Sequence, residues 1–313
     1  MGDRISPRVR LDRLLTLGVV APLRSRIARP QPSRHLRILM YHGISDRTDG
    51  ERHPYFRTVT TPAAFRAQME FLRDGHYRAM TLGDALRWKR SVAPAAEAAG
   101  GSRGDDRAPV VVTFDDGLRD FRSAAFPILE ELGIPATVFL TSGCLNGQFI
   151  TGEECLTDAE IVELAAKGVE FGSHTVSHPQ LATLGDGALR QELEGSRKAI
   201  EDILGRPVDL FSYPYRFPEE DSAFVGRLGA GLIAAGYSAG VTTSIGRAAV
   251  DADPLFLRRL PINDADDLPL FKAKLDGDYD WLHHVQVARK RVRRLLQPKS
   301  PTRAAGHVTE EIQ

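Results

Sequence analysis

The sequence predicts an α/β barrel of parallel strands, complete or distorted, enclosed by helices. Short apolar runs typical of buried strands alternate with helical patterns between Arg37 and Leu260. Polar residues such as Asp115 and His174 follow directly after two of these runs. Because the carboxyl ends of barrel strands meet at one rim, we expect these polar side chains to form one site there.

Short apolar runs define the expected strands. The run at residues 110–114 is continuous rather than alternating, which is typical of a parallel strand buried on both faces. The expected strands cover residues 37–41, 110–114, 136–140, 169–172, 210–213, 238–242 and 257–260.

Helices are expected between these strands because apolar residues recur at helical spacing and capping residues mark the ends. Thr61 and Pro62 begin the first helix, which ends at Gly75. Gly133 and Gly168 end two later ones. The other expected helices cover residues 82–88, 124–132, 158–167, 188–204 and 223–235.

One catalytic domain with a tail at each end is expected, and it covers residues 36–267. Residues 91–109 are rich in alanine, glycine and charge and contain no aromatic residue, so we expect a flexible surface loop there. Residues 1–35 form a basic N-terminal extension. The alternation stops after residue 267, and residues 268–313 are expected to form a basic C-terminal tail.

Charge and hydropathy restrict partners and compartment. The 41 Lys and Arg residues balance the 41 Asp and Glu residues, so no overall field favours nucleic acid as a partner. The apolar run at 14–23 is about half the ~20 residues that a transmembrane helix needs. Arginines follow it where a signal peptide carries small residues, so we expect neither a cleavable signal nor a transmembrane helix. The expected location is cytoplasmic, or peripheral at the inner face of the membrane.

Two interpretations of the basic tails stay open. They are either ordinary terminal segments or segments that contact a membrane. Leucines alternate with arginines between Arg10 and Arg29, and residues 290–299 place arginines around Leu295 and Leu296. Basic amphipathic segments of this kind bind anionic lipid. The two cysteines, at positions 144 and 155, are too few to indicate a compartment, and their pairing stays open.

A carboxylate pair lies at the end of the run at 110–114. Gly117 allows a sharp turn after Asp115 and Asp116, so that the two side chains can point to different places. One can then bind a metal while the other accepts a proton. Asp and Gly are also the ordinary residues of turns, and the motif alone leaves that alternative open.

Two histidines favour the metal-binding interpretation of this motif over an ordinary turn. His174 and His178 follow the run at 169–172, and one helical turn would bring their imidazoles to the same face. With a strand-end carboxylate they form the His-His-Asp set that suits zinc with an open position for water. The set predicts one divalent metal ion, and we expect zinc.

The segments TFDDG at 113–117 and HTVSH at 174–178 resemble the first two motifs of the polysaccharide deacetylase family, carbohydrate esterase family 4. The catalytic unit of that family is the NodB homology domain, and the similarity covers about residues 36–267. The resemblance implies a deformed (β/α) barrel that removes acetyl groups from sugars with a divalent metal. It also implies that Asp115 is the catalytic base and that Asp116, His174 and His178 are the metal ligands.

The family's third motif usually reads Arg-x-Pro-Tyr, whereas residues 212–215 read Ser-Tyr-Pro-Tyr. The resemblance gives the backbone N–H of Tyr215 the role of holding the oxyanion. A packing turn at the barrel rim is the alternative for the same residues. Because Ser212 stands where the arginine is expected, Asp115 lacks its usual orienting partner.

The family's general acid also needs a counterpart. No Leu-x-His is identified near the C-terminus for this role, and His283 and His284 are interpreted as surface or packing residues. Both departures resemble a branch with permuted motifs, typified by deacetylases of exported poly-N-acetylglucosamine, whose acid lies in an N-terminal Tyr-His. His42 fits that branch, and we expect it on the open side of the metal, opposite Asp115, protonating the leaving amine. Arg259 resembles the arginine before the branch's final strand and is expected to orient Asp115.

The sequence therefore predicts a hydrolase that removes N-acetyl groups from a GlcNAc-containing exopolysaccharide or its lipid-linked precursor. One alternative is a deformylase or amide hydrolase of a lipid-linked amino sugar or small molecule. Another is a catalytically inactive barrel that binds glycan. The complete set of a base and three ligands favours an enzyme.

Overall fold

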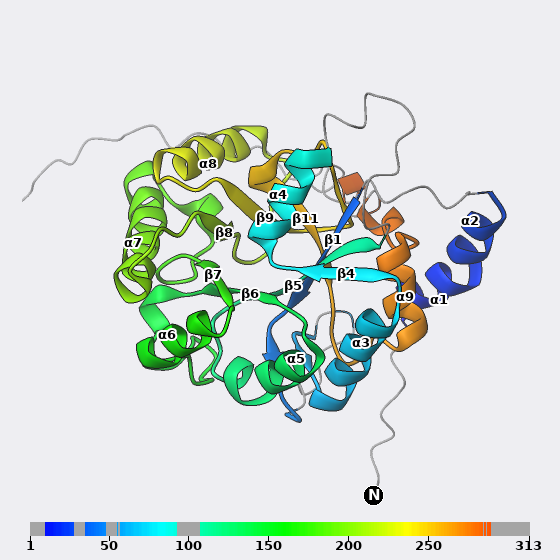
Figure 1. The fold of residues 1–313 in the computed structure, drawn as a ribbon. Coiled ribbons are helices and arrows are strands. Elements are labelled where there is room, and N and C mark those ends of the chain that lie inside the picture. The colour runs from blue at the N-terminus through cyan, green and yellow to red at the C-terminus, as the bar shows by residue number, and fades with distance from the viewer. Residues whose placement is uncertain are drawn as a thin grey trace, which may run out of the picture.

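Seven strands form a closed parallel barrel in the computed structural model, which describes residues 10–27, 35–47, 55, 57–92, 107–283, 285, 287 and 288. The barrel strands are β1 (His35–Tyr41), β5 (Ala108–Phe114), β6 (Ala136–Leu140), β7 (Glu170–Ser173), β8 (Leu210–Ser212), β9 (Ala239–Ile245) and β11 (Leu257–Pro261). Strand β1 pairs in parallel with both β5 and β11, which closes the ring (Figure 1). The prediction of a deformed (β/α) barrel is confirmed.

Short strands outside the ring were not predicted. Strand β4 (Tyr77–Met80) pairs in parallel with β5, and β10 (Ala248–Ala249) pairs antiparallel with β1. Strands β2 (Gly43–Ile44) and β3 (Val59–Thr60) form a separate two-stranded ladder directly after His42. These segments are too short, or too mixed in polarity, to give a periodic signal.

Helices surround the ring and mostly begin at capping residues. They are α3 (Pro62–Asp74), α4 (Leu82–Val92), α5 (Phe126–Leu132), α6 (Asp158–Ala166), α7 (Asp186–Leu204), α8 (Ser222–Ala234) and α9 (Leu268–Asp276). Thr61 caps α3 by accepting from Ala64 N, as the sequence predicted. Thr157 and Glu160 form a capping box on α6, and Gly133 ends α5 in the left-handed conformation.

The barrel strands are buried on both faces. Inside the ring, Ile38, Val111, Phe139 and Val241 belong to one apolar cluster, which continues into Leu86 of α4. The N–H of Leu82 donates to Thr137 near the start of β6, so α4 closes the end of the barrel where the strands begin (Figure 1). Outside the ring, a second cluster packs β1, β5 and β6 against α3, α5, α6 and α9. The opposite end, where the strands finish, stays open for a site.

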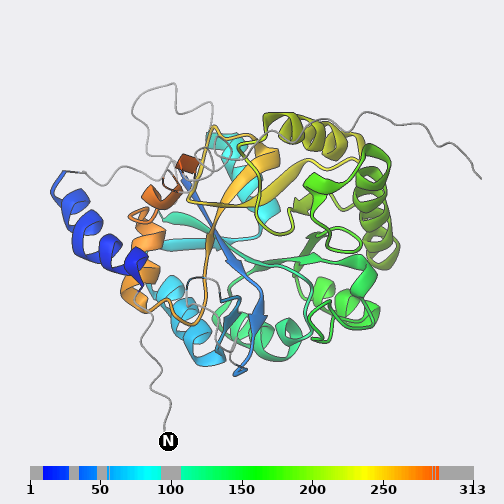
Figure 2. The ribbon, with the colours of Figure 1, turned by 180° about the vertical axis from the view of Figure 1, so that it is seen from behind.

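The packed unit extends beyond residues 36–267. Helix α9, in the region expected to be a tail, buries Leu270 and Phe271, and Asp267 caps this helix by accepting a hydrogen bond from Leu270 N. A helical segment of α1 (Leu11–Leu15), a π-helical turn (Thr16–Val20) and α2 (Ala21–Ile27) packs along α9 on the outside of the barrel (Figures 1 and 2). No helix in the described ranges combines the length and apolar character that crossing a membrane requires.

Parts of the expected loop and tails cannot be compared with the structure. Residues 1–9, 28–34, 93–106 and 289–313 lie outside the described residues, and so does the basic segment at 290–299.

Candidate active site

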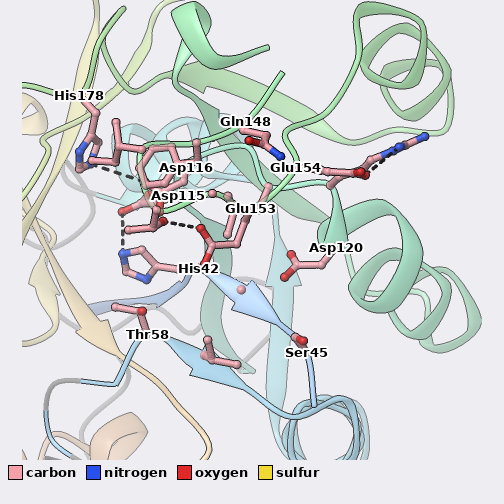
Figure 3. Close-up of a pocket in the computed structure, with 18 of the residues that line it drawn as sticks. His42, Ser45, Thr58, Asp115, Asp116, Asp120, Gln148, Glu153, Glu154 and His178 are labelled. Carbon is pink, nitrogen blue, oxygen red and sulfur yellow. Dashed lines mark hydrogen bonds and ion pairs between the residues drawn. The ribbon is translucent and has the colours of Figure 1, made fainter. Parts of the chain in front are cut away.

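A cavity of about 1150 Å³ opens at the rim where the barrel strands end (Figure 3). The predicted site residues line it, with one exception: Arg259 lies beneath the cavity in the barrel interior. The lining residues predicted from the sequence are His42, Asp115, Asp116, His174, His178 and Tyr215. Segments far apart in the chain therefore meet at one place.

Asp116, His174 and His178 are arranged as a metal-binding set. Asp116 Oδ1 lies 3.4 Å from His174 Nε2 and 3.5 Å from His178 Nε2. A tetrahedral ion about 2.1 Å from each donor would hold the donors about 3.4 Å apart. Asp116 Oδ1 is buried and has no hydrogen-bond donor among the described residues. The donor set and its spacing therefore fit one divalent metal ion.

A sharp turn separates the two carboxylates. Asp116 has a φ of 73° and Gly117 a φ of 72°, and a Cβ at Gly117 would lie 2.9 Å from Leu140 Cδ2. The N–H of Asp115 donates to the Tyr41 carbonyl at 3.0 Å, which ties the turn to β1. As a result Asp115 faces the barrel interior, whereas Asp116 faces the histidines.

The two histidines do not lie on a helical turn, and this expectation was wrong. Residues 174–178 form a loop in which Thr175 and His178 have φ values of 73° and 55°. Glu192 of α7 accepts hydrogen bonds from the N–H groups of Val176 and Ser177 at 2.8 and 3.0 Å. The Thr175 hydroxyl accepts from His178 N. These side-chain acceptors replace the backbone acceptors of a helix.

The two imidazoles have opposite pKa shifts. Burial opposes protonation of His174, but the charges of Asp115 and Asp116 outweigh it and raise the pKa of that ring. His174 Nδ1 lies 2.8 Å from the buried carbonyl oxygen of Ser212, so Nδ1 carries a proton and Nε2 is the nitrogen that faces Asp116. Burial lowers the pKa of His178 to about 4, which keeps that ring neutral.

Asp115 is held by a fully buried arginine. Arg259 Nη1 and Nη2 donate to Asp115 Oδ1 and Oδ2, each at 2.7 Å. Ser212 donates to Asp115 Oδ1 at 3.1 Å and accepts from Arg259 at 3.0 Å. Burial opposes ionisation of Asp115, but the charge of Arg259, with those of His174 and His42, outweighs it and holds the pKa of Asp115 below its usual range. This carboxylate is therefore ionised at neutral pH.

His42 lies beside Asp115 rather than opposite it. His42 Nε2 is 4.0 Å from Asp115 Oδ2, and the ring is partly exposed to the cavity (Figure 3). The strand register is the reason. Tyr41 of β1 pairs with Phe114 of β5, so His42 and Asp115, which follow these two residues, are neighbours. The expectation that His42 faces Asp115 across the metal was wrong in this respect.

Tyr215 stands at the rim with an unusual backbone. Its φ is 55°, and its carbonyl accepts a hydrogen bond from the Thr243 hydroxyl at 2.8 Å. Its N–H makes no hydrogen bond to another described residue. The side chain is 45% exposed, and its ring centroid lies 4.4 Å from that of His178.

Some features of the site gave no signal in the sequence. Asp120 lines the cavity and accepts from Ile44 N at 3.1 Å, and burial raises its pKa to about 7.

The C-terminal region does contain a Leu-x-His, at residues 282–284, so the expectation that none is present there was wrong. His283 does not line the cavity, and His284 lies outside the described residues.

The site geometry and a family model point the same way. A candidate ligand triad beside an ion-paired carboxylate at the open end of an α/β barrel would suit metal-assisted hydrolysis. The family described as polysaccharide deacetylase matches residues 102–229. Residues 102–229 therefore match the polysaccharide deacetylase family, and the resemblance seen in the motifs is confirmed. The matched segment contains Asp115, Asp116, His174 and His178, but neither His42 nor Arg259.

Individual relatives extend the comparison. The chain is 29% identical to YxkH of Bacillus subtilis (strain 168), whose name assigns it provisionally to polysaccharide deacetylases, over 77% of this chain and 76% of that protein. It is 30% identical to the poly-beta-1,6-N-acetyl-D-glucosamine N-deacetylase of Escherichia coli (strain K12), over 34% of this chain and 14% of that protein. The structure of Streptococcus pyogenes deacetylase PplD in complex with acetate matches with a TM-score of 0.63 at 23% identity, covering 78% of this chain and 99% of that one. That last likeness shows the fold.

Proposed function

We propose that the protein is a metal-dependent N-deacetylase of a GlcNAc-containing polysaccharide or of its lipid-linked precursor. The observation that carries the proposal is the spacing of Asp116, His174 and His178, which suits a tetrahedral ion beside an ionised carboxylate. The similarity to the Escherichia coli enzyme supports the substrate class. The cavity of about 1150 Å³ leaves room for at least one sugar residue, because pockets for small ligands usually measure about 300–1,000 Å³.

The proposed mechanism assigns one role to each residue. A zinc ion held by the three ligands would act as a Lewis acid and lower the pKa of a bound water. Asp115, kept ionised by Arg259, accepts the proton of the water that adds to the acetyl carbonyl carbon. The Tyr215 N–H stabilises the developing oxyanion. His42 then donates a proton to the nitrogen as the C–N bond breaks, and acetate and a free amine leave.

The proposal includes a cytoplasmic location, or a peripheral one at the inner face of the membrane. The N-terminal helical segment exposes an apolar row formed by Leu11, Leu14, Leu15, Val19 and Leu23. Three of its arginines turn toward the protein, because Arg10 pairs with Asp266, Arg13 with Asp267 and Arg24 with Asp278. Arg26 is exposed. We infer that the apolar row, rather than the arginines, would contact lipid.

A substrate panel tests the proposed reaction. Acetate and formate release would be measured from N-acetylated and N-formylated GlcNAc oligomers and from a lipid-linked GlcNAc, before and after a chelator. We expect acetate release from an acetylated glycan, lost with the chelator and restored by zinc. Preferential formate release would favour the deformylase alternative, and glycan binding without turnover would favour the inactive barrel.

A further inference from the structure

We propose that Phe149 and Tyr215 are positioning residues that hold the metal ligand His178 in place by packing, and that Phe149 thereby links the wall of the glycan cavity to the metal site. The inference rests on the metal site of the proposed function. It concerns how one ligand is oriented.

The two histidine ligands are supported differently. His174 has a hydrogen-bond acceptor for its second ring nitrogen, the Ser212 carbonyl at 2.8 Å. His178 Nδ1 is buried and has no hydrogen-bond partner among the described residues. Metal-binding histidines usually donate their second N–H to a carboxylate, carbonyl or water, which fixes the ring. Protein packing must supply much of that restraint at His178.

Aromatic rings surround the His178 imidazole. The Phe149 ring lies 5.2 Å from it between centroids with an interplanar angle of 72°, and the Tyr215 ring lies 4.4 Å from it at 58°. The His174 ring is 4.8 Å away. Phe149 is 8% exposed and His178 is 9% exposed, so little free space remains beside the ring. Rotation of the imidazole away from the metal position would have to displace one of these neighbours.

Phe149 belongs to a hairpin of residues 147–156 that forms one wall of the cavity. Gln148 and Glu154 form a β-bridge, and the N–H of Phe149 donates to Glu153 O at 2.8 Å. The N–H of Leu156 donates to the carbonyl of Gly117, the residue after the ligand Asp116. Residues 148–154 all line the cavity. The hairpin therefore touches the surroundings of two metal ligands while facing the space proposed for the glycan.

Metal affinity and a spectroscopic signature test the proposal without substrate. Co²⁺ would replace zinc in the full-length protein. The affinity of the protein for Co²⁺ would be measured by competition with a chelator, and the visible absorption of the Co²⁺-bound protein would be recorded. We expect Phe149→Ala to weaken binding about 10- to 100-fold, the usual effect of losing a residue that orients a ligand, and to shift the absorption bands. Phe149→Leu should restore most of the affinity, because it keeps most of the packing volume. Tyr215→Ala should also weaken binding, although its backbone N–H remains.

Ile150→Ala is the matched control, because Ile150 is the next residue of the hairpin and is 59% exposed. It should leave the affinity and the spectrum for Co²⁺ unchanged. Thermal unfolding without metal would first show that the Phe149→Ala variant is folded. The proposal is overturned if this folded variant binds Co²⁺ as tightly as the unchanged protein and with the same spectrum. It is also overturned if Ile150→Ala loses as much affinity. Tight metal binding without deacetylation by the unchanged protein would contradict the proposed function alone.

Discussion

Arg259 and Asp115 form a two-point ion pair across the interior of the barrel. Their two nitrogen–oxygen distances are both 2.7 Å, and both side chains are buried. The residues come from β11 and β5, which are not neighbours in the ring but flank β1 on either side. Ser212, at the third-motif position where the family usually has arginine, bonds to both partners. Asp115, the proposed base, is thus oriented by a residue that lies 144 positions further along the chain.

Arg259→Ala is expected to cost both stability and activity. Removing one partner leaves a buried, unpaired carboxylate, so the free energy of unfolding should fall by about 3–5 kcal/mol. The pKa of Asp115 should rise, because burial is then no longer offset, and the acid limb of kcat/KM should move to higher pH. Denaturant unfolding and a pH–rate profile measure the two effects. The neighbouring, exposed Arg258→Ala is the control, and equal effects from both variants would refute the orienting role.

His42→Ala is expected to lower kcat by about 10²- to 10⁴-fold while metal binding is retained. A proton donor matters most when the leaving group is an amine, so the loss should shrink on an aryl acetate. Steady-state kinetics on an acetylated oligosaccharide and on the ester would show the difference. His76→Ala, on the exposed surface, serves as the control. The same loss on both substrates would mean that His42 positions the site without acting as its acid.

Asp120 is expected to make stability depend on pH. Burial raises the folded-state pKa of Asp120 to about 7, whereas an exposed Asp titrates near pH 4. Its contribution to stability is therefore fully present below about pH 4 and is lost as the pH rises through about 7. Asp120→Asn does not titrate, so it should gain stability relative to the unchanged protein between pH 5 and pH 8. Urea unfolding without added metal measures this, with the exposed Asp46→Asn as control. A constant difference across that range would contradict the assignment.

Substituting the exposed apolar row tests the proposed membrane contact. The unchanged protein should float with vesicles that contain phosphatidylglycerol, and a variant with serine at Leu11, Leu15, Val19 and Leu23 should not. The control variant carries serine at Val162 and Ile233, which are exposed apolar residues elsewhere on the surface. If the unchanged protein stays with the unbound fraction, or if the row variant floats equally well, the segment does not contact lipid in this way.

Local sequence signals predicted much of the barrel and identified the three residues that the structure brings together as a candidate metal site. The apolar run ending at Phe114 identified β5, and the adjoining motif placed Asp115 and Asp116 at its end. Residues 136–140 form β6 with the predicted bounds, because the run is continuous and follows a glycine-ended helix. These features depend on neighbours within a few residues, which a sequence pattern can report.

Long-range contacts explain what the sequence did not predict. The loop carrying His174 and His178 depends on Glu192 of α7, and the spacing of the histidines fits a helical turn equally well. His42 lies beside Asp115 because β4 is outside the ring, so that β1 pairs directly with β5. Phe149 reaches His178 only through the hairpin at 147–156. Pairings between distant segments set each of these relationships, and no local pattern specifies them.

Metal content measured beside acetate release in two single variants tests the central claim most directly. The claim is that Asp116, His174 and His178 hold the metal while Asp115 acts as the base. Full-length Asp115→Asn should retain about one zinc ion per chain, as expected for three intact ligands, and release no acetate from an acetylated oligosaccharide. His174→Ala should lose both the metal and the activity, because only two ligands remain. Equal loss of metal from the two variants, or acetate release by the metal-free protein, would contradict the account.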